Sequence, residues 1–161
     1  MAVKSLLKYC TDLPRISLKP KQEIITEKSV SNRLYVLHQG VLEVHRGDEA
    51  ISMVTEPGAV FGEMSVLLAI PHTANVRAVT ASSVYVVDNA STYLGQHPEF
   101  LLPIAQILAS RLRNSTTYLV DLKKQFKDQT DHFAMVDEVL ESMAHEQMGD
   151  FTPDEDLPID P

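Results

Sequence analysis

The stretch that decides the fold is residues 57–78, which read PGAVFGEMSVLLAIPHTANVRA. Gly58 and Gly62 permit tight backbone turns, and the apolar run after them predicts one short helix, Met64–Leu68. The N-terminus of such a helix directs unpaired backbone N–H groups toward an anion. Glu63 stands at its entrance, where a carboxylate can cap the helix or accept hydrogen bonds from the hydroxyls of a ligand.

The same stretch continues with a polar turn, Pro71-His72-Thr73-Ala74, which leads back into a strand. This turn places a possible cation, a hydroxyl and a small residue next to one another. Together with the helix N-terminus and the carboxylate, it supplies the parts of a phosphate-binding segment inside a β fold.

Short runs of β-type residues surround this segment. Turns rich in Gly and Pro separate them, and Gln39-Gly40 predicts a two-residue hairpin. Short strands at such regular spacing favour a β-sandwich, a jelly roll or a small barrel. The expected strands are Arg15–Leu18, Gln22–Thr26, Arg33–His38, Val41–Arg46, Ala50–Val54, Asn75–Thr80 and Ser83–Val87.

These features together resemble the phosphate-binding cassette of the cyclic nucleotide-binding domain, the module of the catabolite activator protein family, cyclic-nucleotide-dependent kinases and gated channels. The family pattern is Phe-Gly-Glu, an apolar helix, and Pro-Arg-Ser/Thr-Ala before a strand. Here Phe61-Gly62-Glu63, the spacing to Pro71, and Thr73-Ala74 match that pattern. The wider resemblance covers about residues 10–128. It implies an α+β fold, a double-stranded β-helix (jelly roll or β-roll) with a short cassette helix and a long C-terminal dimer helix.

The resemblance also implies roles for individual residues. Glu63 would bind the ribose 2′-hydroxyl of a cyclic nucleotide. The backbone of Gly62, Met64 and Ser65 would face the cyclic phosphate at the N-terminus of the short helix.

Thr73 would offer its hydroxyl to the phosphate or to the purine, and Ala74 would keep space open beside it. In the catabolite activator branch a Thr-Ser pair on the long helix touches the base, and Ser115 and Thr116 stand at the similar place here. The alternative for this pair is an ordinary helical Ser and Thr with no ligand.

One departure from the family pattern is His72, which stands where the family has its phosphate-binding arginine. Arg supplies a permanent charge and a fork that fits phosphate oxygens, whereas His is largely neutral at pH 7. We expect this exchange to lower nucleotide affinity by roughly ten- to a hundred-fold without erasing the site. Arg77 falls on the opposite strand face and is not expected to substitute. The alternative is that His72 is a loop residue with no part in binding.

After Asp88 the apolar period becomes helical. Pro98 suits a first helical turn, and Pro103 predicts a kink or a restart. A seam with a 3.5-residue period then follows, which indicates either a helix packed on the sheet or a two-stranded dimer helix. Its positions are Leu108, Leu112, Ser115, Leu119, Leu122, Phe126 and Gln129.

The last part of the chain differs in charge from the rest. Residues 127–161 carry eleven Asp and Glu against one Lys, whereas residues 1–126 have a net charge of +2. We expect residues 1–128 to form the cyclic nucleotide-binding domain with its long helix. Residues 129–148 are expected to form an acidic amphipathic helix, with Thr130 or Asp131 as cap, and residues 149–161 an acidic tail without fixed structure.

Composition excludes several classes of protein. The net charge of the 161 residues is -8, which disfavours binding to a nucleic-acid backbone. The single cysteine, Cys10, precludes an intrachain disulfide and suggests a reducing compartment, so a cytoplasmic location is expected. No apolar run is long enough to span a membrane. The six histidines form no metal-binding pair, and no catalytic motif is present, so neither a metal site nor an enzyme is predicted.

These observations predict a stand-alone, dimeric sensor or adaptor that needs no cofactor. It would bind cAMP or cGMP between the β-roll and the long helix, and would signal through protein contacts, with residues 130–161 as one candidate surface. The alternative is a degenerate domain that binds no nucleotide and acts as a dimeric protein-interaction module.

Overall fold

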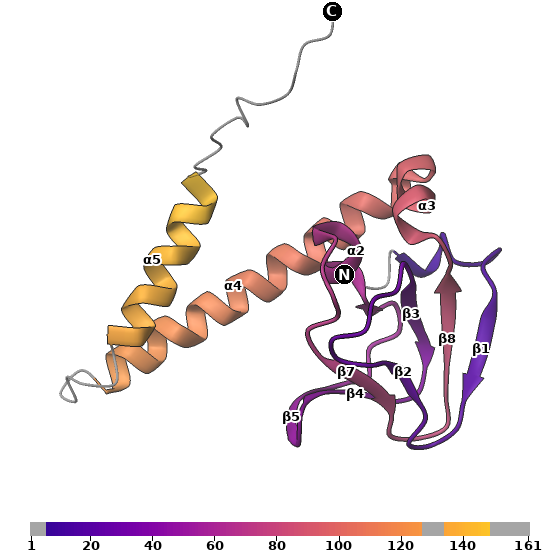
Figure 1. Cartoon of the computed structure of the whole chain (residues 1–161), viewed down its shortest axis with the longest axis horizontal. Helices are drawn as coiled ribbons and strands as arrows, with labels where there is room; N and C mark the ends of the chain where they lie inside the picture. The colour runs from indigo at the N-terminus through magenta and orange to yellow at the C-terminus, as the bar shows by residue number, and fades with distance from the viewer. Residues whose placement is uncertain (1–5, 127–133, 149–161) are drawn as a thin grey trace, which may run out of the picture. The chain divides into compact units, whose positions relative to one another are not determined.

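The computed structural model describes residues 6–126 and 134–148 (Figure 1). The chain divides into two compact units, residues 1–109 and residues 110–161. Within the described part of the first unit, eight strands form two four-stranded antiparallel sheets. The α+β jelly-roll architecture is therefore confirmed.

The first sheet has the order β1 (Arg15–Leu18), β8 (Ser82–Val87), β3 (Leu34–Gln39) and β6 (Val60–Phe61). The second sheet has the order β2 (Glu23–Ile25), β7 (Asn75–Ala78), β4 (Leu42–Arg46) and β5 (Glu49–Val54). The seven strands expected from the sequence are all present, with ends shifted by two residues at most. β6 has only two residues, too few for an alternation pattern to reveal it.

The predicted hairpin at Gln39-Gly40 is wrong. β3 pairs with β8 and β6, whereas β4 pairs with β5 and β7, so the chain crosses from one sheet to the other at this point. Gly40 adopts a φ of 108°, and a Cβ there would lie 2.1 Å from the Ser82 hydroxyl. Gly40 therefore lies in a connection between the two sheets. The sequence of a two-residue loop alone does not distinguish such a connection from a hairpin.

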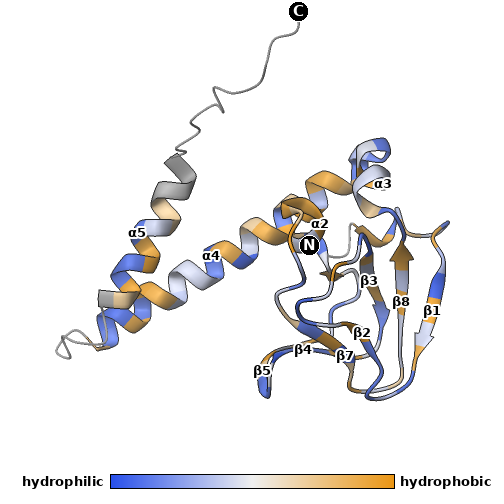
Figure 2. Cartoon of the chain, in the orientation of Figure 1, coloured by the Kyte–Doolittle hydropathy of each residue, from blue (hydrophilic) through white to orange (hydrophobic). Residues whose placement is uncertain are grey.

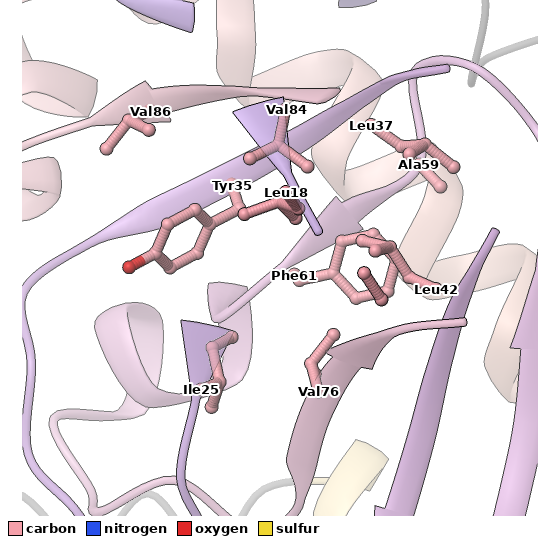
Figure 3. Packing of buried hydrophobic residues seen from close by; sticks show 11 residues of the cluster. Leu18, Ile25, Tyr35, Leu37, Leu42, Ala59, Phe61, Val76, Val84 and Val86 are labelled. Carbon is pink, nitrogen blue, oxygen red and sulfur yellow. The ribbon is translucent and has the colours of Figure 1, made fainter. Parts of the chain in front are cut away.

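The interior of the roll is filled by apolar side chains from both sheets (Figure 3). Tyr35 and Leu37 of β3 point into this interior, whereas Leu34 and Val36 join a second cluster with residues of the flanking helices. The first sheet is thus covered on both faces, which explains the continuous apolar run of β3. The interior cluster comprises Leu18, Ile25, Tyr35, Leu37, Leu42, Ala59, Phe61, Val76, Ala78, Val84 and Val86.

Helices follow the last strand. α3 (Ala90–Gln96) and the 3-10 turn η1 (Pro98–Phe100) lead into α4 (Leu101–Gln125). Of the kink or restart predicted at Pro103, the structure shows the restart: η1 ends at Phe100, α4 begins at Leu101, and this proline is buried in the first turn of α4. Its missing N–H would have no intrahelical partner there, so the helix continues without interruption.

The second unit contains the C-terminal part of α4 and α5 (Ala134–Met148). Lys123 of α4 donates a hydrogen bond to Asp137 of α5. Hydrophobic and hydrophilic residues alternate along α4 (Figure 2).

The expected domain boundary at residues 128/129, the cap at Thr130 or Asp131, and the tail at 149–161 lie outside the described residues. None of the helices in the described ranges has the length and apolar character to cross a bilayer.

Candidate functional site

The candidate site begins where β6 ends. Phe61 is anchored in the interior cluster, and Gly62 follows with a φ of 86° as the N-cap of α2 (Glu63–Leu68). A Cβ at position 62 would lie 2.7 Å from the Arg33 carbonyl oxygen, so only glycine fits this turn. The helix predicted over Met64–Leu68 is thus present and one residue longer. We call the segment from Phe61 to Ala74 the cassette.

The side chains in the first turn of α2 differ strongly in solvent exposure. Glu63 is only 4% exposed and Ser65 only 7%, whereas Met64 lies 45% exposed at the surface. The Gly62 carbonyl accepts the first helical hydrogen bond, from the Val66 N–H at 3.2 Å. The first turn of α2 therefore buries a carboxylate and a hydroxyl, from the residues directly before and after an exposed methionine.

His72 is buried, with 4% of its surface exposed. Its Nδ1 lies 2.9 Å from the Ser65 Oγ, and its Nε2 lies 2.7 Å from the Ser31 Oγ. Both ring nitrogens are therefore engaged by serine hydroxyls, one as donor and the other as acceptor in the neutral ring. The imidazole connects α2 to the segment between β2 and β3.

Burial also lowers the pKa of His72 below its ordinary value of 6.5. Desolvation penalises the charged form, and no carboxylate among its hydrogen-bond partners offsets that effect. The imidazole is consequently neutral at pH 7. A neutral ring with both nitrogens engaged does not reproduce the charge of the family's arginine.

The backbone around His72 extends the pairing of β2 and β7. The His72 N–H donates to the Ser29 carbonyl at 2.9 Å, and the His72 carbonyl accepts from Lys28 at 2.7 Å. The Asn75 side chain accepts a further bond from the Glu27 N–H. These bonds fix the end of the cassette against the β2–β3 segment.

Thr73 and Ala74 are half-buried and lie directly before β7. The Thr73 carbonyl accepts a hydrogen bond of 2.9 Å from the Nε of Arg46, the last residue of β4. Arg77 pairs instead with Glu43, Nε to Oε2 at 2.6 Å. The structure thus brings Gly62, Ser65 and His72 into one cluster, with Thr73 and Ala74 adjacent in the chain.

Ser115 and Thr116 lie on α4, in the second unit. Ser115 is exposed, and the Thr116 hydroxyl donates to the Leu112 carbonyl at 2.9 Å, one turn earlier in the same helix. Such a bond satisfies the hydroxyl locally. A contact of this pair with a purine base stays a prediction.

Two residues of the site were not predicted. Ser31 stands in the segment between two strands, and no local signal pairs it with a histidine 41 positions later. Arg46 carried a weak signal, because its place in β4 puts it on the same strand face as the core residues Leu42 and Val44.

A cavity of about 520 Å³ lies on the Ser31 side of His72. Its lining is largely polar and includes Thr26, Ser29 and Arg33. Arg33 is held by Asp88 at 2.6 Å, and hydrogen bonds to Tyr35 and Asp88 raise its pKa. Among the residues that the structure describes, no group of three or more His, Cys, Asp or Glu is placed to hold a metal ion.

Comparison with known proteins agrees with this geometry. Residues 15–93 match the family model of the cyclic nucleotide-binding domain. A CRP-like cAMP-activated global transcriptional regulator from two strains of Mycobacterium tuberculosis is 26% identical over 105 residues. That alignment covers 62% of this chain and 47% of the relative, so the chain matches about half the length of this protein.

Solved structures show the same fold. A cyclic nucleotide-binding domain from Methylobacillus flagellatus superposes with a TM-score of 0.59 at 18% identity, covering 74% of this chain and 83% of that one. A structure described as Sp-2Cl-cAMPS bound to PKAR CBD2 gives a TM-score of 0.54 at 23% identity, covering 74% and 86%. With the antiparallel roll, the Gly62 turn and the family match on the same residues, residues 15–93 of this chain are a cyclic nucleotide-binding domain.

Proposed function

We propose that this protein is a regulatory protein whose cassette binds a cyclic nucleotide, cAMP or cGMP. The observation that carries the proposal is the buried carboxylate of Glu63 directly after the Gly62 turn, in a domain of this family. The Mycobacterium tuberculosis relative is described as cAMP-activated, and one solved neighbour contains a cAMP analogue. Both descriptions support a cyclic nucleotide as the ligand of this chain.

In this proposal each part of the cassette has a task. The Glu63 carboxylate accepts a hydrogen bond from the ribose 2′-hydroxyl, and the backbone of Gly62, Met64 and Ser65 faces the phosphate. Thr73 offers its hydroxyl to the phosphate or the purine. Hydrogen bonds to a charged acceptor such as Glu63 stabilise a complex by about 1.5–3 kcal/mol.

The output that we propose is a protein contact. The protein would act as a homodimer through α4, and Ser115 and Thr116 would contact the base. Nucleotide binding would favour one arrangement of the helices, because a ligand shifts an equilibrium only by its differential affinity for the two states. Residues 130–161 are a candidate surface for a protein partner. The predictions of a stand-alone, cytoplasmic, non-enzymatic role without nucleic-acid or membrane binding belong to the same proposal.

The alternative function is a dimeric interaction module that binds no nucleotide. One observation favours it: His72 replaces the family's arginine and is neutral, with both ring nitrogens engaged by Ser65 and Ser31. The loss of that one charge-assisted contact weakens a site by about one to two orders of magnitude, which leaves measurable binding.

Isothermal titration calorimetry with cAMP and cGMP tests the proposal. We expect saturable binding by the wild-type chain, and a loss of about tenfold in affinity for Glu63→Gln. Glu56→Gln is the matched control, because Glu56 is an exposed carboxylate in the turn before β6. Absence of heat with both nucleotides at millimolar concentration would favour the interaction module. Equal effects of the two variants would remove Glu63 from the binding site.

A further inference from the structure

The cassette needs a positive charge that His72 does not provide. A cyclic phosphodiester carries one negative charge, and a neutral imidazole engaged by Ser65 and Ser31 offers it neither charge nor a free donor. The question is therefore which cation of the described chain lies near the turn Thr73-Ala74.

Three guanidinium groups lie close to the cassette or its strand. Arg33 is paired with Asp88 and Arg77 with Glu43, both at 2.6 Å, so a carboxylate already neutralises each of them. Arg46 differs from both, because within the described residues it takes part in no ion pair, although Glu49 lies opposite it on β5. Within the described part of the chain, the guanidinium of Arg46 makes one hydrogen bond, from Nε to the Thr73 carbonyl.

The strand register places Arg46 at the cassette. β4 and β7 pair Val44 with Val76 and His45 with Asn75, and continuing the register by one residue sets Arg46 opposite Ala74. Leu42 and Val44 pack into the interior cluster, and Arg46 follows on the same face of the strand. Ala74, which the continued register sets opposite Arg46, carries only a methyl group as its side chain.

We propose that Arg46 of β4 is the phosphate-binding cation of this site, in place of the arginine that the cassette has lost. The proposal rests on the proposed function, since it names a residue of the same nucleotide site. The bond from Nε to the Thr73 carbonyl orients the guanidinium and leaves its two terminal NH₂ groups for two oxygens of one phosphate. The charge thus comes from the strand that pairs with the end of the cassette.

The test is a cAMP titration of the full chain by calorimetry at low and high salt, with four proteins. We expect Arg46→Gln to lose about ten- to a hundred-fold in affinity, and Arg46→Lys to lose less, because it keeps the charge without the fork. Arg15→Gln removes the same charge from an exposed site on β1 and should bind like the wild type. Wild-type affinity should fall with salt, and Arg46→Gln should lose most of that dependence.

The outcomes separate the two proposals. No binding by the wild-type chain would overturn the proposed function and this assignment together. Binding by the wild type that Arg46→Gln leaves unchanged, or that Arg15→Gln weakens equally, would overturn the assignment of Arg46 alone. A purely structural role predicts that Arg46→Gln lowers the melting temperature while Arg46→Lys gains nothing in affinity, and that result would also overturn it.

Discussion

At the scale of single residues, His72 shows how burial decides the chemistry of a titratable group. Its ring lies between the hydroxyls of Ser65 and Ser31, and its pKa is lowered by desolvation. We therefore regard His72 as a residue that holds α2 against the β2–β3 segment. In this arrangement its direct contact with a phosphate stays a prediction, whereas its contact with two serines is observed.

The lowered pKa of His72 predicts an acid-sensitive fold. The unfolded chain binds a proton near pH 6.5 and the folded chain only at lower pH, so the contribution of His72 to stability is complete above 6.5 and is lost as the pH falls below it. Chemical unfolding of the wild type and of His72→Gln measures this contribution. Their difference in unfolding free energy should shrink between pH 7 and pH 5, and a constant difference would contradict the neutral, buried imidazole.

Gly62 predicts a second effect at this scale. Its φ of 86° and the 2.7 Å approach of a Cβ to the Arg33 carbonyl mean that Gly62→Ala should destabilise the fold by more than about 1 kcal/mol. Gly95→Ala is the matched control, because Gly95 lies within α3 and a Cβ there meets no atom within 4 Å. That change should stabilise the helix by about 0.5–1 kcal/mol. Equal urea midpoints for the two variants would refute the special role of the Gly62 turn.

Only the part of the candidate site that lies in one short segment of the sequence was predictable. Gly62, Glu63 and the turn from Pro71 to Ala74 follow one another closely in the chain, so their spacing could be recognised. Ser31 reaches the same region from the segment between β2 and β3, and Arg46 reaches it from the end of β4, through contacts that depend on the pairing of β2 and β4 with β7. The sequence pattern does not reveal which strands pair or in which register, so the contacts of these two residues could be found only from the structure.

At the scale of elements, the strands were predictable and their pairing was not. The expected strands Val41–Arg46 and Ala50–Val54 are present as β4 and β5, and the structure shows that these two strands form a hairpin. The turn signal at Gln39-Gly40 marks a crossing between two sheets, because Gly40 packs against Ser82. The residues of a turn thus predict that the chain changes direction, whereas the strand with which the next strand pairs depends on the packing of the whole roll.

The apolar seam of α4 predicts the outcome of a charge inserted into it. Leu112 is 41% exposed in the single chain, so a charge at this position should disturb an interface more than the fold. If α4 forms the proposed dimer, Leu112→Glu should yield a folded monomer in sedimentation equilibrium, while Thr117→Glu, exposed and off the seam, should stay dimeric. A wild-type chain that sediments as a monomer would contradict the dimer, and an unfolded Leu112→Glu would indicate that the seam packs within the chain.

At the scale of the whole molecule, the sequence separates two parts with different physical character. Residues 1–126 carry a net charge of +2, and the acidic charge belongs to residues 127–161. The family match ends at residue 93, within the first compact unit. The sensing function that we propose depends on residues of the β-roll and of α4, all of which precede the acidic part, so a change in that part should affect partners more than nucleotide affinity.

The most direct test of nucleotide binding in the cassette is an NMR titration of the ¹⁵N-labelled chain with cAMP. We predict saturable shifts of the backbone amides at Gly62, Glu63, Met64 and Ser65, and at Thr73 and Ala74. Amides that stay unshifted throughout the chain at millimolar cAMP, or shifts confined to the polar cavity around Thr26 and Ser29, would contradict the account.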